Sequence, residues 1–426
     1  MVRRDYRQIG ETVLEETLEN GLRVFLFPKP EFIKRYAFFA TRYGGMDTRF
    51  QLNGRWLDTP MGIAHYLEHK MFDMPWGNAL QRLSATGASP NAFTSTAITG
   101  YHFECTDGFE DNLRVLLEFV STPYFTQESV DKEQGIIGQE IQMYEDDPGW
   151  QVYRGLMEGL YRHHPARNSV AGSLESIARI DAATLDCCHE AFYTPSNMVL
   201  CVAGDVDPEA VCALAREILP KEKKPPIPRD CGLDEPREVF QRETGRTMAV
   251  ARPIFQLGVK LAPAPDGPGR LRQQLLGDLA CEALMGSSSP LYSRLYAQGL
   301  INGGFSCGYS DNPGCAFLTA GGESGEPEKV RDAVLEEAAR IGREGLDEGL
   351  FQRLRKAAYG GWVRSLNSFE NLCVTQARAY FDGHDPWTFP EVYAGLERRD
   401  AEELLRTWVL PEQTTLTVIR PGEAKG

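Results

Sequence analysis

Strand-like and helix-like apolar patterns follow one another in the first third of the chain. An apolar run at residues 22–27 follows Asn20-Gly21, a dipeptide typical of a β-hairpin, and residues 36–45 form a second strand-like run. Helical spacing then appears in three segments, 61–72, 112–120 and 129–144. Because strands come first and helices follow, the pattern predicts an α+β fold rather than a βαβ alternation.

The second half of the chain repeats part of this pattern. Residues 193–210 and 409–424 each contain a proline turn, a short apolar strand and a glycine turn, and an amphipathic helical segment precedes each. Residues 220–236 contain five prolines and a basic run, which is typical of an extended linker. We therefore predict two related α+β domains joined by a linker, at residues 1–220, 221–236 and 237–426.

Composition and charge narrow the functional classes. The chain has 426 residues and is 42% hydrophobic and 25% charged, as expected for a globular protein with more than one core. With 45 Lys and Arg against 60 Asp and Glu, the formal net charge is −15. This charge disfavours binding to nucleic acid or to an anionic membrane surface, because both contacts depend on basic residues.

Targeting signals and cysteine spacing bear on the compartment. The sequence contains no run of about 18 apolar residues that could span a membrane, and acidic residues stand where a signal peptide needs an apolar segment. Ten cysteines are spread along the chain without a C-x-x-C pair. We therefore expect free thiols and a cytoplasmic location.

One short motif carries candidate chemistry. In the helical segment 61–72, His65, Glu68 and His69 stand at i, i+3 and i+4, so their side chains share one helix face. Two imidazoles at this spacing suit Zn²⁺, and the glutamate between them suits a general base. A five-residue motif also arises by chance, and histidines occur on helix surfaces without function. Zinc catalysis further requires a third protein ligand.

The helical segment 129–144 offers candidates for that ligand. Glu133 and Glu140 lie seven residues apart on one predicted face, among Ile136, Ile137 and Ile141. A buried carboxylate needs a metal or a cationic partner. On spacing alone, a pair of solvated carboxylates beside an apolar stripe remains the favoured alternative.

At this point the sequence resembles a known family, the pitrilysin or inverzincin zinc metallopeptidases. The similarity rests on His65-Tyr-Leu-Glu68-His69, on Glu140, and on GASPNAFTSTAITGYHF at residues 87–103. It covers residues 10–215, is strongest to the bacterial YmfH-like branch, and extends more distantly to processing-peptidase subunits.

The resemblance implies a fold and a site. It implies two homologous α/β-sandwich domains of the LuxS/metallohydrolase type, with antiparallel-rich sheets packed against helices in a half-clamshell. His65, His69 and Glu140 would bind one Zn²⁺ per chain, Glu68 would be the catalytic base, and Glu133 would support catalysis. Peptide substrate would bind as an added strand along the segment Asn91, Ala92, Phe93 and Thr94.

The second half departs from the family pattern. Family members usually carry an Arg and a Tyr there that hold the substrate. Arg294 is present and is our candidate for substrate binding, but Ile301-Asn302 replace the expected Tyr after Leu300. We therefore expect a homodimer, or a heterodimer with a related non-catalytic chain that supplies the Arg/Tyr pair.

Two functions remain open at the level of sequence. The first is a zinc metalloendopeptidase in which Glu68 activates a water molecule. The second is a non-catalytic scaffold or binding subunit on the same fold, although a scaffold has no need of a base between two histidines.

Overall fold

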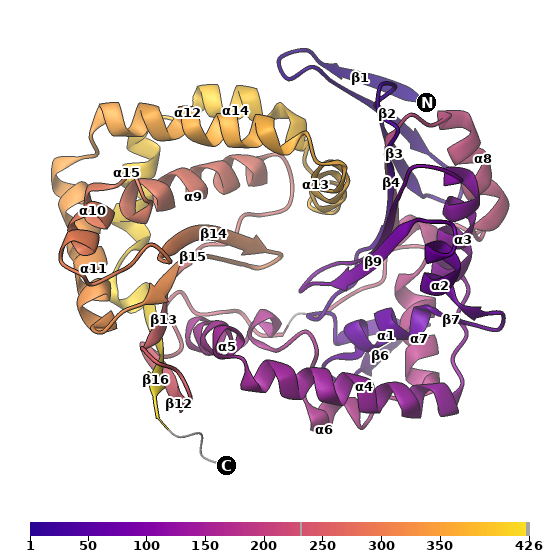
Figure 1. Cartoon of the computed structure of the whole chain (residues 1–426), viewed down its shortest axis with the longest axis horizontal. Coiled ribbons are helices and arrows are strands. Elements are labelled where there is room, and N and C mark those ends of the chain that lie inside the picture. The colour runs from indigo at the N-terminus through magenta and orange to yellow at the C-terminus, as the bar shows by residue number, and fades with distance from the viewer. Residues whose placement is uncertain (231, 423–426) are drawn as a thin grey trace.

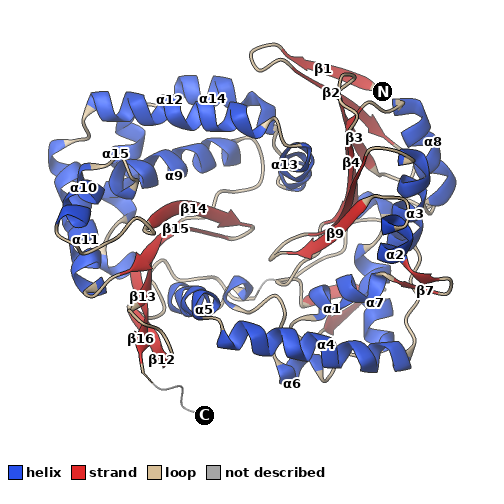
Figure 2. Cartoon of the chain, viewed as in Figure 1, coloured by secondary structure: helices blue, strands red, loops and turns tan. Residues whose placement is uncertain are grey.

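Two large β-sheets, one in each half of the chain, organise the structure (Figures 1 and 2). The computed structural model describes residues 1–230 and 232–422. The strands of the first sheet are β1 (Val2–Tyr6), β2 (Glu11–Thr17), β3 (Arg23–Pro28), β4 (Arg35–Thr41), β9 (Ser89–Thr94), β10 (Thr99–Cys105) and β11 (Met198–Gly204). Those of the second are β12 (Glu243–Met248), β13 (Ile254–Leu261), β14 (Ser306–Asn312), β15 (Cys315–Glu323) and β16 (Thr414–Pro421). Two small hairpins are β5 (Arg49–Leu52) with β6 (Arg55–Asp58), and β7 (Asp73–Met74) with β8 (Gly77–Asn78).

The two sheets share one topology. The first has the order β1-β2-β3-β11-β4-β10-β9 and the second β12-β16-β13-β15-β14. In each, the last strand in sequence pairs in parallel with one neighbour and antiparallel with the other, as β11 does with β3 and β4 and β16 with β12 and β13. Within the described residues, β1 and β2 extend the first sheet, and the second sheet has no such extension. The prediction of two related α+β units is therefore confirmed.

Fifteen α-helices surround the sheets in the described residues. The first half contains α1 (Ile63–Met71), α2 (Ala79–Ser84), α3 (Phe109–Ser121), α4 (Gln127–Asp146), α5 (Pro148–Leu160), α6 (Leu174–Ile177), α7 (Ala182–Phe192) and α8 (Pro208–Ile218). The second contains α9 (Gly269–Met285), α10 (Pro290–Ala297), α11 (Pro327–Glu344), α12 (Glu348–Ser365), α13 (Phe369–Phe381), α14 (Phe389–Gly395) and α15 (Arg398–Trp408). None of the helices formed by these residues is long and apolar enough to cross a membrane.

The halves exchange one helix each. Helix α5 packs against β12, β13 and β16 of the second sheet, where Leu156 and Leu160 are fully buried. Helix α13 packs against β4 and β11 of the first sheet, where Phe369 and Leu372 join the core of Phe38 and its neighbours. Figure 1 shows α5 beside β13 and α13 beside the first sheet. Each sheet is thus covered partly by the half to which it does not belong in sequence.

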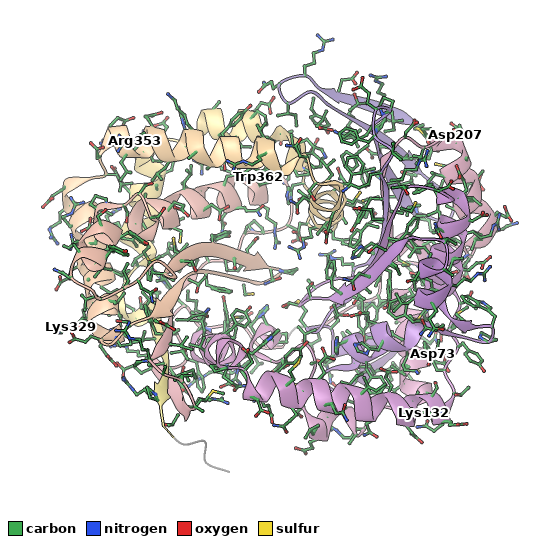
Figure 3. The ribbon with its side chains drawn as sticks, in the orientation of Figure 1. Asp73, Lys132, Asp207, Lys329, Arg353 and Trp362 are labelled. Atoms are coloured by element: carbon green, nitrogen blue, oxygen red, sulfur yellow. The ribbon has the colours of Figure 1, made fainter. Side chains whose placement is uncertain are left out.

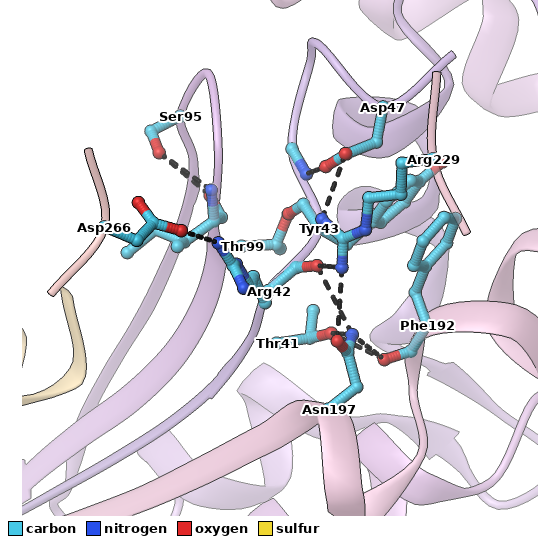
Figure 4. A network of polar contacts seen from close by, with 12 residues as sticks. Thr41, Arg42, Tyr43, Asp47, Ser95, Thr99, Phe192, Asn197, Arg229 and Asp266 are labelled. Atoms are coloured by element: carbon cyan, nitrogen blue, oxygen red, sulfur yellow. Dashed lines mark hydrogen bonds and ion pairs between the residues drawn. The ribbon is translucent and has the colours of Figure 1, made fainter. Parts of the chain in front are cut away.

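The proline-rich segment is fastened to the first half (Figure 4). Arg229 pairs with the buried Asp47 at 3.0 Å, donates to the Asn197 amide oxygen at 3.1 Å, and donates to the backbone carbonyl of Arg42. Arg42 in turn pairs with Asp266 of the second half at 2.9 Å. The predicted linker is therefore held to the first half through Arg229, while the domain boundaries drawn around it stay a prediction.

The start of α1 differs from the sequence expectation. The sequence predicts a helical segment over residues 61–72, but α1 begins at Ile63 after Gly62. Asp58 belongs to β6 and pairs with Arg49. Gly62 adopts φ +91°, and a Cβ there would lie 2.6 Å from the Ala171 carbonyl oxygen, so close packing fixes the start of the helix.

Candidate metal centre

Helices α1 and α4 bring the motif histidines and the distant glutamates together. Ile63, Leu67 and Met71 form the buried stripe of α1, as the four-residue spacing predicts. The Tyr66 hydroxyl donates to the Val130 carbonyl at 2.5 Å and thereby ties α1 to α4. The remaining side of α1 presents His65 and His69, whose ring centroids lie 4.6 Å apart.

Glu140 lies opposite both imidazoles. The distance from His65 Nε2 to Glu140 Oε1 is 3.6 Å, and that from His69 Nε2 to Glu140 Oε2 is 3.7 Å. One atom from each of the three residues lies within 4.8 Å of the others, and they are the only such group of potential metal ligands found in the part of the chain that the structure describes.

This arrangement fits a zinc ion. Zn–N and Zn–O bonds of about 2.0–2.1 Å in a tetrahedron put neighbouring ligand atoms about 3.4 Å apart. The two His–Glu separations are close to this value, and three protein ligands leave a fourth position open. Nε2 is the ring atom of His65 that faces Glu140, at 3.6 Å, while Nδ1 is buried without a hydrogen-bond partner among the described residues.

Glu133 contacts the outer side of His69. Its Oε1 accepts a hydrogen bond from His69 Nδ1 at 3.0 Å, and its Oε2 lies 3.7 Å from Lys70 Nζ. Burial opposes ionisation of Glu133, but His69 and Lys70 lower its pKa. Burial likewise opposes the charged form of His69, yet the hydrogen bond to Glu133 and the surrounding carboxylates raise its pKa. Burial and the neighbouring His69 lower the pKa of His65 to about 4.

Glu68 is buried beside the end of strand β9. It is 7% exposed, and its Oε2 accepts a hydrogen bond from the Thr94 hydroxyl at 2.7 Å. Burial raises the pKa of Glu68, as is useful in a group that must take up a proton. Thr94, predicted from the sequence as a substrate contact, therefore also touches the candidate base.

The segment Asn91–Thr94 forms most of an edge strand. Strand β9 pairs with β10, with Asn91 opposite His102 and Thr94 opposite Thr99, and within residues 1–230 and 232–422 it has no second neighbour. A cavity of about 260 Å³ lies beyond Thr94 and Tyr144, with largely apolar walls that include Ile141, Trp150 and Met157. Two larger cavities, of about 650 and 570 Å³, lie against the second sheet and do not contact the candidate ligands.

The second-half candidates lie away from this cluster. The Arg294 guanidinium pairs with Glu337 of α11 at 3.2 Å, and none of the contacts made by the described residues connects it to His65, His69 or Glu140. Asn302 donates to Glu323 and accepts from the Gly304 N–H, so its amide is used within a local turn. The assignment of Arg294 to substrate binding stays a prediction without support from a contact.

Two side chains that contact the candidate metal centre, Tyr144 and Lys70, were not predicted from the sequence. The Tyr144 hydroxyl donates to Glu140 Oε1, and Lys70 contacts Glu133. Tyr144 stands one turn after Glu140, a spacing that the sequence displays, and Lys70 is a charge beside a predicted buried stripe. Of the three isoleucines around the glutamates, Ile137 and Ile141 are buried, whereas Ile136 is 57% exposed.

Known proteins share this fold and this sequence. The family model "Insulinase (Peptidase family M16)" matches residues 56–174, and the model "Peptidase M16 inactive domain" matches residues 179–358. A Bacillus subtilis protein named uncharacterized zinc protease YmfH is 37% identical over 98% of this chain and 98% of its own length. This chain belongs to the M16 family of peptidases. The pitrilysin-family resemblance and the expectation of zinc as cofactor are confirmed, because the family uses zinc and its relatives are named zinc proteases.

Solved M16 structures agree with the fold. An M16-like peptidase from Alicyclobacillus acidocaldarius superposes with a TM-score of 0.92 at 31% identity, over 97% of this chain and 99% of its own. Pitrilysin superposes with a TM-score of 0.77 at 18% identity, and the match covers 99% of this chain but 46% of pitrilysin. This chain therefore shares the fold of the Alicyclobacillus protein over nearly its whole length, and the fold of about half of pitrilysin.

Proposed function

We propose that this chain is a zinc-dependent endopeptidase, the catalytic subunit of a pair, which hydrolyses peptides or unfolded polypeptides bound as an added strand in a closed chamber. The observation that carries the proposal is the convergence of His65, His69 and Glu140 beside the buried carboxyl of Glu68. A non-catalytic protein has no use for a base next to an open metal position.

Each residue then has a role. His65, His69 and Glu140 would hold Zn²⁺, which when bound supplies Lewis-acid polarisation of a carbonyl and lowers the pKa of a water molecule. Glu68 would take the proton from the attacking water and return it to the leaving amine. The Thr94 hydroxyl would orient the Glu68 carboxylate through its 2.7 Å hydrogen bond. Glu133 would hold His69 through Nδ1.

Substrate would add to the free edge of β9 through main-chain hydrogen bonds, which demand little of its sequence. Because β9 ends at Thr94, beside Glu68, a strand added there would run past the reacting atoms. The cavity beyond Thr94 and Tyr144 would accept an apolar side chain, since Ile141, Trp150 and Met157 line it.

The decisive experiment is Glu68→Gln in the purified chain, assayed on a quenched unfolded-protein substrate together with its metal content. Hydrolysis should fall to background while bound zinc stays at the wild-type level, because the base is lost and the ligands remain. Retained hydrolysis in Glu68→Gln would eliminate the mechanism. Wild-type activity should disappear with a chelator and return when Zn²⁺ is added.

The proposed pairing with a second chain can be tested separately. We propose that a second chain supplies the Arg/Tyr pair, because Ile301 is buried and Asn302 is engaged by Glu323 where the family expects a Tyr. Adding a co-purified partner should raise the rate of peptide hydrolysis. Full activity of the isolated chain, without dimerisation, would contradict this part of the proposal.

The second candidate function is a scaffold or binding subunit, which the match of residues 179–358 to the inactive-domain model allows. It predicts that peptides bind with or without metal and are never cleaved. Peptide binding measured beside hydrolysis, with and without chelator, separates the two functions.

A further inference from the structure

Lys70 is a buried cation next to the metal centre. It follows His69 on α1, and its side chain is only 1% exposed. Its ammonium group has three N–H donors and faces three oxygens: the Asp73 carboxylate, the Ser129 carbonyl at 3.1 Å and Glu133 Oε2 at 3.7 Å. Figure 3 labels Asp73 above the part of α4 that carries Lys132. Burying a charge costs free energy unless such partners compensate it, so these three oxygens stabilise the buried ammonium group of Lys70.

Lys70 contacts only one of the two glutamates of α4 that face the metal centre, Glu133 and not Glu140. Glu133 and Glu140 lie on the same side of α4, and either oxygen pair has the chemistry of a zinc ligand. Both oxygens of Glu133 are engaged, one by His69 Nδ1 and the other by Lys70. Glu140 instead faces Nε2 of both histidines. With its Nδ1–H donated to Glu133, His69 presents the lone pair of Nε2 to the centre.

We propose that Lys70 is a positioning residue of the metal centre: it holds Glu133 in the orientation that accepts the His69 Nδ1–H and keeps Glu133 from becoming a metal ligand. This inference rests on the proposed zinc function. A competing effect has the opposite sign, because a nearby ammonium also repels Zn²⁺. Two carboxylates, Asp73 and Glu133, offset that repulsion, so we expect positioning to dominate.

The test compares zinc affinity in Lys70→Met and in the wild type, by competition with a chromophoric chelator. Affinity should fall by up to roughly 10-fold, the low end of the range for direct partners of ligands, because Lys70 acts one contact further out, through Glu133. The visible spectrum of the Co²⁺-substituted protein should change as well, because the ligand set loses its fixed orientation. Unchanged affinity and spectrum, or tighter zinc binding, would overturn the inference.

A matched control separates positioning from stability. Lys260 is also buried, at 3% exposure, and pairs with Glu235 at 2.6 Å far from the metal ligands. Lys260→Met should lower thermal stability without changing zinc affinity or the Co²⁺ spectrum. If Lys260→Met weakened zinc binding as much as Lys70→Met, the effect would be general destabilisation and the inference would fail.

A double mutant tests the route of action. If Lys70 acts through Glu133, Lys70→Met should add little to the loss of affinity in Glu133→Gln, whereas independent effects would multiply and contradict the proposal. Should Lys70→Met fail to fold, Lys70→Gln replaces it, because its amide can still donate to the Ser129 carbonyl. A wild-type chain that binds no zinc would overturn the proposed function itself, a result distinct from equal zinc affinity in wild type and variant.

Discussion

Helices α1 and α9 occupy the same place in the two sheets and carry different chemistry. In the sequence, α1 comes after β4 and the β5–β6 hairpin, and α9 comes after β13. Strands β4 and β13 each pair antiparallel with the last strand of their sheet, β11 or β16. Each helix also packs beside an edge strand, α1 on β9 and α9 on β14. Helix α1 presents His65, Glu68 and His69. Helix α9 presents Asp278 and Glu282, whose pKa values are raised, chiefly by burial, to about 7 for Asp278.

The difference shows that the duplicated scaffold does not by itself make a metal site. Both halves place a helix against an edge strand, yet the group formed by His65, His69 and Glu140 has no counterpart in the described residues of the second half. The halves differ in the side chains on one face of α1, His65 and His69, and in Glu140 on the crossing helix α4. The predictions below test this contrast between the halves.

Removing a carboxylate from each half should have very unequal effects. Glu140→Gln should weaken zinc binding more than 100-fold, because it removes a proposed ligand rather than one of the outer contacts that contribute roughly 10–100-fold. Glu282→Gln removes a carboxylate from α9 of the second half and should leave zinc affinity unaltered. Chelator competition measures both. Equal losses would show that the second half also contributes to the metal centre.

The helix exchange should couple the stability of the halves. Leu156→Ala on α5 and Phe369→Ala on α13 each leave a cavity beneath the opposite sheet, and each should lower the free energy of unfolding by roughly 3–4 kcal/mol. Because each helix links both cores, both variants should shift a single urea transition. Leu174→Ala, at a site 50% exposed, is the control and should change little. Two transitions, of which each variant moves only one, would refute the coupling.

The contact between Glu235 and Lys260 should make stability depend on pH. Burial opposes ionisation of Glu235, but Lys260 and the backbone N–H groups of Arg162, His163 and His164 lower its pKa from 4.5 to about 2. Because this pKa is lower in the folded state, ionised Glu235 stabilises the protein above pH 4.5, and this stabilisation is lost as pH falls toward 2.

Glu235→Gln should therefore lower the free energy of unfolding by roughly 2–3 kcal/mol near neutral pH, with a shrinking difference below pH 4.5. Urea unfolding at several pH values measures the change. A pH-independent difference between the two proteins would show that lost hydrogen bonds, and not the charge of Glu235, stabilise this contact.

Asp278 should give the opposite dependence of stability on pH. Its pKa is raised from 3.8 to about 7, so its contribution is present below pH 3.8 and is lost as pH rises through 7. Asp278→Asn should raise the free energy of unfolding near pH 8, by at most roughly 4 kcal/mol for a shift of about 3 pKa units, and should change it little near pH 4. Thermal unfolding at both values measures it. A loss of stability near pH 8 would mean that the ionised carboxylate has a stabilising partner.

Several features of the fold could be predicted from local sequence. The apolar run at residues 22–27 and the four-residue spacing of Ile63, Leu67 and Met71 set a strand and a buried helix face, because both depend on neighbours close in the chain. The start of α1 could not be predicted, since it depends on the approach of Ala171 to Gly62 across more than a hundred residues. The exchange of α5 and α13 left no local signal either.

The amino-acid sequence alone determined the spacing of His65, Glu68 and His69 and the repeated closing strand, because side-chain spacing on a helix and strand propensity are local properties. Only the tertiary structure decided that Glu140 faces both imidazoles while Glu133 turns to His69 Nδ1 and Lys70. The reason is that two equivalent carboxylates on one helix are distinguished solely by how α4 crosses α1, and packing over the whole domain sets that crossing.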